Sequence, residues 1–173
     1  MTRKEVGTMV EHDEEDVLLF RQELCTGCLY CYLACSYEHF GVLSLSLSHI
    51  KIIPDESKPG YFIGIHCAHC HDPICEASCP QDAITKDEKT GWVSINKMRC
   101  IGCKTCNIMC PISIPWRHPV QKLSHKCDFC DGDPKCVKFC PTSAIIVTTR
   151  REAEEYVEKK LGIKVHDSRK IKK

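Results

Sequence analysis

The sequence predicts a small α+β fold in which short strands alternate with cysteine-bearing loops and a helix follows the last loop. Three observations lead to this expectation. All 16 cysteines of the 173 residues fall into four quartets. Short apolar runs, typical of brief strands, flank these quartets. A stretch with helical periodicity follows the last quartet. We therefore expect a polar arm at 1–16, one cysteine-rich domain at 17–148, and a helix with a basic tail at 149–173.

Two cysteine spacings alternate along the chain. The first and third quartets have two, two and three residues between successive cysteines, whereas the second and fourth have two, then four or five, then three. The quartets are Cys25, Cys28, Cys31, Cys35; Cys67, Cys70, Cys75, Cys79; Cys100, Cys103, Cys106, Cys110; and Cys127, Cys130, Cys136, Cys140. The alternation predicts two tandem copies of a two-quartet unit, related by a pseudo-twofold repeat.

The third quartet gives the clearest indication of what the cysteines bind. It reads C-x2-C-x2-C-x3-C-P and ends at Pro111, the bacterial pattern for a [4Fe–4S] cluster in which the fourth cysteine binds a different cluster. Iron in such clusters is held by soft, anionic thiolates. At four thiolates per cluster, the 16 cysteines predict four [4Fe–4S] clusters, with every cysteine a metal ligand and no catalytic residue in the chain. Because the apolar core is small, we expect the clusters to supply much of the folding free energy.

Three other uses of the cysteines fit the sequence less well. Disulfide frameworks are typical of small secreted domains, and the first residues contain no apolar signal segment. Zinc ribbons pair two C-x2-C units and need neither a third close cysteine nor a Cys-Pro ending. The run Cys67-Ala-His-Cys70-His71 matches a haem attachment motif, but that use would leave Cys75 and Cys79 without a role.

Histidine and tryptophan residues near the quartets give weaker signals. His66, His69 and His71 surround the second quartet. A Rieske centre needs histidines in place of two cysteines, and this quartet is already complete. We expect these histidines to be surface residues or hydrogen-bond donors to cluster sulfur. Trp116, in the proline-rich stretch 111–119, either covers a cluster or is an ordinary packed side chain.

The expected elements follow from short-range patterns. Apolar runs predict strands at 17–20, 43–47, 50–53 and 61–65, and a hairpin joins 83–85 to 92–95. Residues 33–40 form one or two helical turns that end at Gly41. Thr149 and Glu152 form a capping box for the last helix, which ends at Gly162. Its apolar face contains Ala153, Tyr156, Val157 and Leu161.

Charge and hydropathy exclude several functions. The formal net charge is +1, which indicates no broad field for nucleic acid or membrane. No apolar run approaches the 18 or so residues of a membrane span. A cytoplasmic protein is expected. Only two asparagines occur among many lysines and glutamates, a weak tendency of thermophilic proteins.

The motifs resemble those of a known family, the four-cluster electron-transfer subunits of the dimethyl-sulfoxide-reductase and formate-dehydrogenase type. The resemblance covers about residues 17–148. Its specific parts are Pro73 and Pro80 in the second quartet, Cys-Ile-Gly-Cys-Lys in the third, and Lys126-Cys127-Asp128-x-Cys130 in the fourth.

This resemblance implies how the quartets share their clusters. It pairs the first quartet with the fourth and the second with the third. Spacing alone leaves open the pairing of first with second and third with fourth. The implied ligand sets are Cys25, Cys28, Cys31, Cys140; Cys127, Cys130, Cys136, Cys35; Cys67, Cys70, Cys75, Cys110; and Cys100, Cys103, Cys106, Cys79.

The resemblance also implies the function. The chain lacks the long insertion of the larger relatives between the third and fourth quartets, and is similar to compact cytoplasmic members. It implies a non-catalytic subunit that relays single electrons between a larger catalytic subunit and an external acceptor such as soluble ferredoxin. A tungsten- or molybdenum-pterin aldehyde oxidoreductase is the favoured partner, in a heterodimer. The alternatives are a free-standing polyferredoxin carrier or the relay subunit of a hydrogenase, formate dehydrogenase or carbon monoxide dehydrogenase.

Overall fold

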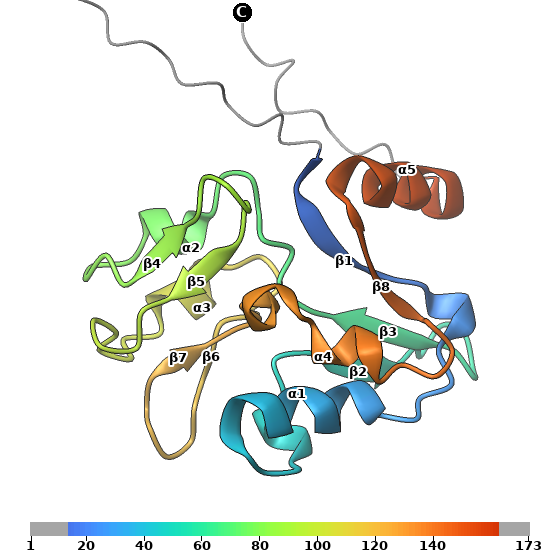
Figure 1. The fold of residues 1–173 in the computed structure, drawn as a ribbon, viewed down its shortest axis with the longest axis horizontal. Helices are drawn as coiled ribbons and strands as arrows, with labels where there is room; N and C mark the ends of the chain where they lie inside the picture. The colour runs from blue at the N-terminus through green and yellow to red at the C-terminus, as the bar shows by residue number, and fades with distance from the viewer. Residues whose placement is uncertain (1–13, 163–173) are drawn as a thin grey trace, which may run out of the picture.

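The computed structural model describes residues 14–162, and within them every sheet is an antiparallel pair of short strands (Figure 1). The pairs are β1 (Asp16–Phe20) with β8 (Ile145–Thr149), β2 (Lys51–Pro54) with β3 (Phe62–Ile65), β4 (Ile84–Lys86) with β5 (Val93–Ile95), and β6 (Trp116–Arg117) with β7 (Ser124–His125). The α-helices are α1 (Tyr30–Phe40), α2 (Ile74–Ala77), α3 (Thr105–Met109), α4 (Lys135–Lys138) and α5 (Arg150–Leu161). An α+β fold of short strands is therefore confirmed.

Segments that are distant in the sequence pair to form two lobes. One lobe, which we call the outer lobe, is built from the first and last elements of the chain. Its strands β1 and β8 pair in a register that runs from Asp16 opposite Thr149 to Phe20 opposite Ile145, and α1 packs against α4. The other lobe, which we call the inner lobe, is built from elements in the middle of the sequence. Here α2 packs against α3 and beside the β4–β5 hairpin (Figure 1). The first quartet therefore lies beside the fourth, and the second beside the third. A tandem repeat between sequence halves stays a prediction.

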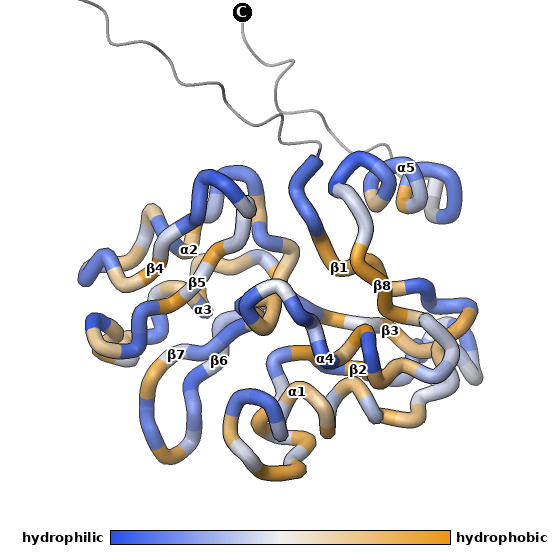
Figure 2. Tube along the Cα trace, viewed as in Figure 1, coloured by the Kyte–Doolittle hydropathy of each residue, from blue (hydrophilic) through white to orange (hydrophobic). Residues whose placement is uncertain are grey.

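The apolar core is divided between the lobes and includes sulfur. The outer core contains Leu18, Ile50, Ile52, Phe129 and Ile145, together with two buried cysteines. The inner core is smaller, with Ile84, Val93 and one buried cysteine at its centre. Strands β1 and β8 are hydrophobic where they cross the molecule, whereas α5 is largely hydrophilic (Figure 2).

Aromatic rings join the two lobes. Trp92, beside β5, stacks on Phe129 with ring centroids 4.5 Å apart and an interplanar angle of 15°. Phe129 in turn meets the edge of His69 at 5.7 Å. Both Phe129 and His69 are only 1% exposed. Since aromatic contacts of this kind contribute about 0.5–1.5 kcal/mol beyond burial, they help fix how the lobes meet.

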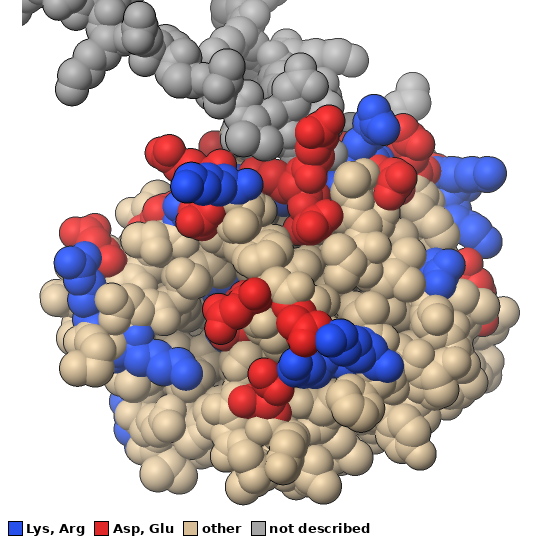
Figure 3. All heavy atoms as spheres, in the orientation of Figure 1, with Lys and Arg blue, Asp and Glu red and all other residues tan. Residues whose placement is uncertain are grey.

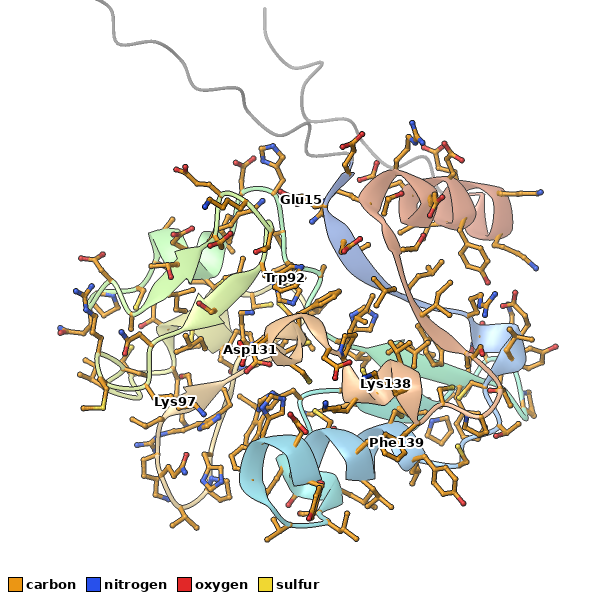
Figure 4. The ribbon with its side chains drawn as sticks, viewed as in Figure 1. Glu15, Trp92, Lys97, Asp131, Lys138 and Phe139 are labelled. Carbon is orange, nitrogen blue, oxygen red and sulfur yellow. The ribbon has the colours of Figure 1, made fainter. Side chains whose placement is uncertain are left out.

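A buried ion pair ties three further segments together. The Glu15 side chain is 6% exposed and lies 2.9 Å from Lys86 Nζ and 2.9 Å from an Arg150 guanidinium nitrogen. Arg150 also donates to the His69 carbonyl oxygen at 2.7 Å. Glu15, which is labelled in Figure 4, precedes β1. Lys86 ends β4 and Arg150 begins α5. Removing one partner of such a pair leaves an uncompensated buried charge, so these three segments hold their places together.

Two sequence-based expectations were wrong. The strand expected at 43–47 is a 3₁₀ turn, Leu45–Leu47, and Leu43 and Leu45 are 68% and 51% exposed. Alternation predicts a strand only where another strand can pair with it, and none does so here among the described residues. The proline-rich stretch 111–119, for which no strand was predicted, contains β6, which pairs with β7. Helix α1 also begins earlier than expected, at Tyr30.

The remaining expected strands are present within about two residues of their predicted bounds, and the C-terminal helix is capped nearly as expected. The Thr149 hydroxyl accepts from the Glu152 backbone N–H at 3.3 Å, and Gly162 ends α5 in a left-handed conformation. The Glu152 carboxylate bonds the Thr148 hydroxyl. The polar arm, apart from residues 14–16, and the basic tail lie outside the described residues. Among the residues described, no helix is long and apolar enough to cross a membrane.

Candidate iron–sulfur sites

All four cysteine loops share one backbone feature. The residue before the second cysteine is left-handed in each, at Gly27 (φ 70°), His69 (45°), Gly102 (67°) and Phe129 (65°). This conformation costs a residue with a Cβ roughly 1–2 kcal/mol, and glycine avoids that cost. At His69 and Phe129 the rings are buried against each other, and that burial offsets the strain.

Backbone N–H groups point at several sulfurs. In the second and fourth quartets the chain turns after the Cys-Pro pair, and the N–H four residues beyond the cysteine donates to its sulfur. The distances are 3.4 Å from Ala83 to Cys79 Sγ and 3.2 Å from Ala144 to Cys140 Sγ. Cys35 lies within α1 and instead accepts from the His49 N–H at 3.2 Å. Such donors stabilise anionic sulfur.

In the outer lobe the cysteines gather into two sets, which we call sites A and B. Site A is Cys25, Cys28, Cys31 and Cys140, which line one small cavity together. Site B is Cys35, Cys127, Cys130 and Cys136. Burial raises the pKa of Cys136, and the charges of the other three site B thiols raise it further.

In the inner lobe two further sets form sites C and D. Site C is Cys67, Cys70, Cys75 and Cys110. Burial raises the pKa of Cys70, and the charges of Cys67 and Cys110 add to that shift. Site D is Cys79, Cys100, Cys103 and Cys106, which line a second small cavity. The structure thus brings together the same four sets that the family resemblance implied.

The sites follow one another in the order A, B, C, D. Cys31 of site A is close enough to Cys136 of site B to raise its pKa, and Cys67 of site C acts likewise on Cys127 of site B. Sites C and D are built from the same two quartets. Cys110 of site C belongs to the third quartet, and Cys79 of site D belongs to the second. A row of sites is an arrangement suited to moving charge from one end of the protein to the other.

The donor set fits iron–sulfur clusters. Each site offers four sulfurs, and backbone N–H groups donate to the sulfur of Cys35, Cys79 and Cys140. Burial raises the pKa of Cys31 to about 12 and those of Cys75 and Cys130 to about 11. Because a cluster needs thiolates, its binding must release protons and supply positive iron to the buried sulfur.

Comparison with known protein families shows to which family the chain belongs. A model of the 4Fe-4S dicluster domain matches residues 59–150, more than half of the chain. The chain belongs to this iron–sulfur family. It is thus a ferredoxin-like iron–sulfur protein of electron transport, of the kind that forms oxidoreductase subunits.

Three relatives illustrate the family. The chain is 39% identical over 134 residues to the aliphatic sulfonate oxidoreductase, polyferredoxin-like subunit, of Pyrococcus furiosus, with 76% of each chain covered. It is 31% identical over 141 residues to the thiosulfate reductase electron transfer subunit PhsB of Salmonella typhi, covering 75% of this chain and 73% of the relative. It is 31% identical over 183 residues to the hydrogenase-2 operon protein HybA of Escherichia coli O157:H7, covering 85% of this chain but only 56% of HybA.

The three histidines singled out from the sequence each have a ring nitrogen close to a protein group other than sulfur. His69 Nδ1 accepts from the Val93 N–H at 2.9 Å, and burial lowers the pKa of His69 to about 2, so its ring is neutral. His66 Nδ1 lies 3.2 Å from the Cys67 carbonyl oxygen, and His71 Nδ1 lies 3.2 Å from Asp72. Their expected role as hydrogen-bond donors to cluster sulfur stays a prediction, whereas His69 is buried and not a surface residue.

A different group of histidines, missed by sequence reasoning, lies between sites B and D. His39 Nε2 is 3.7 Å from Cys130 Sγ, and His39 and His49 stack at 4.1 Å. The group is His39, His49, His118 and His125 with Phe40 and Trp116. Trp116 stacks on His118 and His125, so it is packed among rings. Because these residues come from three separate segments, no local pattern links them.

Lys126, near sites B and C, is unusual because it is a lysine that is only 3% exposed. Its ammonium donates to the carbonyl oxygens of Val93 and Cys127, the latter at 2.7 Å. No carboxylate lies within ion-pair distance of it in the part of the chain that the structure describes. Its charge acts on Cys75 of site C and Cys127 of site B, where it partly offsets the rise in pKa that burial causes. Lys126 is thus a buried countercharge shared by two sites.

We expect Gly102→Ala to damage site D selectively. Alanine at this left-handed position would be strained, and its Cβ would overlap the Lys122 carbonyl oxygen. The iron content should fall by about four atoms per chain, the loss of one cluster. Gly41→Ala is the matched control, because Gly41 has nearly the same φ of 68° but open space around its Cβ. Equal iron content in the two variants would contradict the predicted overlap.

Proposed function

We propose that this chain is a non-catalytic electron-transfer subunit that holds four [4Fe–4S] clusters, one at each of sites A to D. The observation that carries the proposal is the gathering of all 16 cysteines into four all-sulfur sets in a row. When bound, the clusters supply one-electron oxidation and reduction. The chain itself fixes their spacing and shapes their surroundings.

The residues around the sulfurs determine the surroundings of the clusters. N–H donors to Cys35, Cys79 and Cys140 favour the anionic form of the sulfur. Burial in the outer core keeps water from site B, where Cys35 and Cys136 are each 6% exposed. Electron transfer between fixed sites requires no proton donor or acceptor, so no acid–base pair is assigned to the chain.

The proposed partner is a larger catalytic oxidoreductase subunit in the cytoplasm, with a tungsten- or molybdenum-pterin aldehyde oxidoreductase still favoured. The names of the relatives support a role beside a catalytic subunit, since they refer to a sulfonate oxidoreductase and a thiosulfate reductase. A sulfonate oxidoreductase is the second candidate, because the relative at 39% identity bears that name. A free-standing carrier remains the alternative to any subunit.

Anaerobic purification of the native protein followed by elemental analysis tests these proposals. We expect about 16 iron atoms per chain and a larger subunit that co-elutes with tungsten or molybdenum. Iron on an isolated monomer would instead favour the free carrier. Zinc without iron would contradict the cluster assignment.

The pairing of quartets is tested by two neighbouring cysteines. Cys106 belongs to site D and Cys110 to site C, although the two lie in one sequence quartet. We expect Cys106→Ser and Cys110→Ser to perturb different clusters, visible as the loss or change of different signals in reduced-state electron paramagnetic resonance spectra. Loss of the same signal in both variants would show that each quartet holds its own cluster.

Removing the buried countercharge should shift two potentials. We expect Lys126→Met to lower the midpoint potentials at sites B and C, because a nearby positive charge favours the reduced, more negative state. At a fixed poise the ratio of reduced to oxidised cluster should fall about tenfold, equal to about 59 mV for a one-electron couple. Lys126→Arg keeps the charge and should leave both potentials close to those of the unaltered protein. Four unchanged potentials in a fully loaded Lys126→Met protein would refute this role.

A further inference from the structure

Acidic residues are absent from a long stretch around the third quartet. Residues 89–127 contain no aspartate or glutamate, yet they contain seven lysines and arginines. The chain as a whole is almost balanced, with 24 basic and 23 acidic residues. The stretch supplies three of the four sulfurs of site D. Positive charge is therefore concentrated at one end of the row of sites.

The structure gathers five of these cations around the exposed loop of site D. Lys104 directly follows Cys103 and begins α3. Arg117 Nε donates to the Lys122 carbonyl oxygen at 2.8 Å, and both residues lie against Gly102. The β6–β7 hairpin thus brings its cations to the cysteine loop.

The other two cations lie near the same cysteine loop and hairpin. Arg99 donates to the Asp82 carbonyl oxygen at 3.5 Å, next to the segment that follows Cys79. Lys97 lies at the edge of the inner lobe near β6 and β7 (Figure 4), and its charge acts on His125 of β7. Arg99 and Lys97 therefore flank the same end of the molecule as the hairpin cations.

Apolar side chains and a sulfur lie exposed on the same segments as these cations. Met98, Ile101 and Ile108 are 94%, 61% and 77% exposed, and Cys103 is an exposed cysteine of site D. The five cations have no carboxylate within ion-pair distance in the range 14–162. We call this the site D surface: Lys97, Arg99, Lys104, Arg117 and Lys122 around Met98, Ile101 and Ile108.

Some cations elsewhere on the molecule are paired with carboxylates. Lys135 and Lys138 on α4 both pair with Asp133, at 2.7 Å and 2.5 Å. Figure 3 shows these cations beside red carboxylates in the middle of the face, where Figure 4 labels Lys138 and Asp131. The five cations of the site D surface differ from these two lysines, since none of the five has a carboxylate within ion-pair distance among residues 14–162.

We propose that the site D surface docks an acidic, soluble one-electron carrier protein. Unpaired cations raise the rate at which a negatively charged partner arrives, and the apolar centre can lose water on contact. Cys103 directly precedes Lys104 and lines one small cavity with Ile101, so the carrier would meet the last site of the row at its most exposed sulfur. This inference rests on the proposed relay function and adds where the carrier binds and what charge it has.

Stopped-flow kinetics with a defined carrier tests the docking surface. The full chain, loaded with its clusters and reduced, is mixed with an acidic flavodoxin, whose semiquinone is detected by its long-wavelength absorbance. We expect the second-order rate to fall with rising ionic strength. In Lys97→Glu/Lys104→Glu it should fall about tenfold or more at low salt, the scale of electrostatic steering, and the difference should vanish at high salt.

A charge-matched variant on the other lobe is the control. Lys51 and Lys58 are exposed on and beside β2, and Lys51→Glu/Lys58→Glu makes the same change in net charge. An equal loss of rate in this control, or a rate insensitive to salt in the unaltered protein, would overturn the proposal. The proposal would also be overturned if Lys97→Glu/Lys104→Glu left the rate of carrier reduction unchanged but abolished binding to anionic vesicles or DNA.

The cluster content of every variant is measured first. A chain that binds no iron would refute the proposed function itself. A fully loaded chain with the wrong salt dependence would refute only the docking surface. The two failures are therefore distinguishable.

Discussion

The fold depends on one constraint: four sulfurs from two separate segments must meet at each site. Three come from one loop and the fourth from a quartet far away in the sequence. In the outer lobe this requires α1 to pack on α4 and β1 to pair with β8. The strands can be short because sulfur sites occupy much of the space that an apolar core would fill. Buried thiols at Cys35, Cys106 and Cys136 are part of the core itself.

The left-handed loop position shows two solutions to the same backbone requirement. Gly27 and Gly102 adopt it without strain, and both are closely covered, by the Phe62 ring and the Lys122 carbonyl. His69 and Phe129 adopt it at a cost and bury their rings between the lobes. The loops that hold sulfur therefore also supply the contact between lobes, so local ligand geometry and overall arrangement are coupled.

Positive charge has two distinct roles in this molecule. Lys126 is buried, bonded to carbonyl oxygens and close to two sites, so its effect is on the electrostatic environment of sulfur in a medium of low dielectric constant. The cations of the site D surface are exposed, where solvent and salt screen them. The first kind of charge tunes an interior, and the second kind acts on an approaching partner.

The sequence by itself determined the grouping of the cysteines and most local structure. Cysteine spacing identified four quartets, and Thr149 and Gly162 marked the ends of the last helix, because ligand loops and helix caps involve only neighbouring residues. Tertiary structure alone decided which quartets lie together, that residues 43–47 form no strand, and that four histidines gather beside Trp116. These features depend on which distant segment supplies a hydrogen-bond partner or covers a side chain. Local periodicity contains no information about that choice, since packing between distant segments settles it.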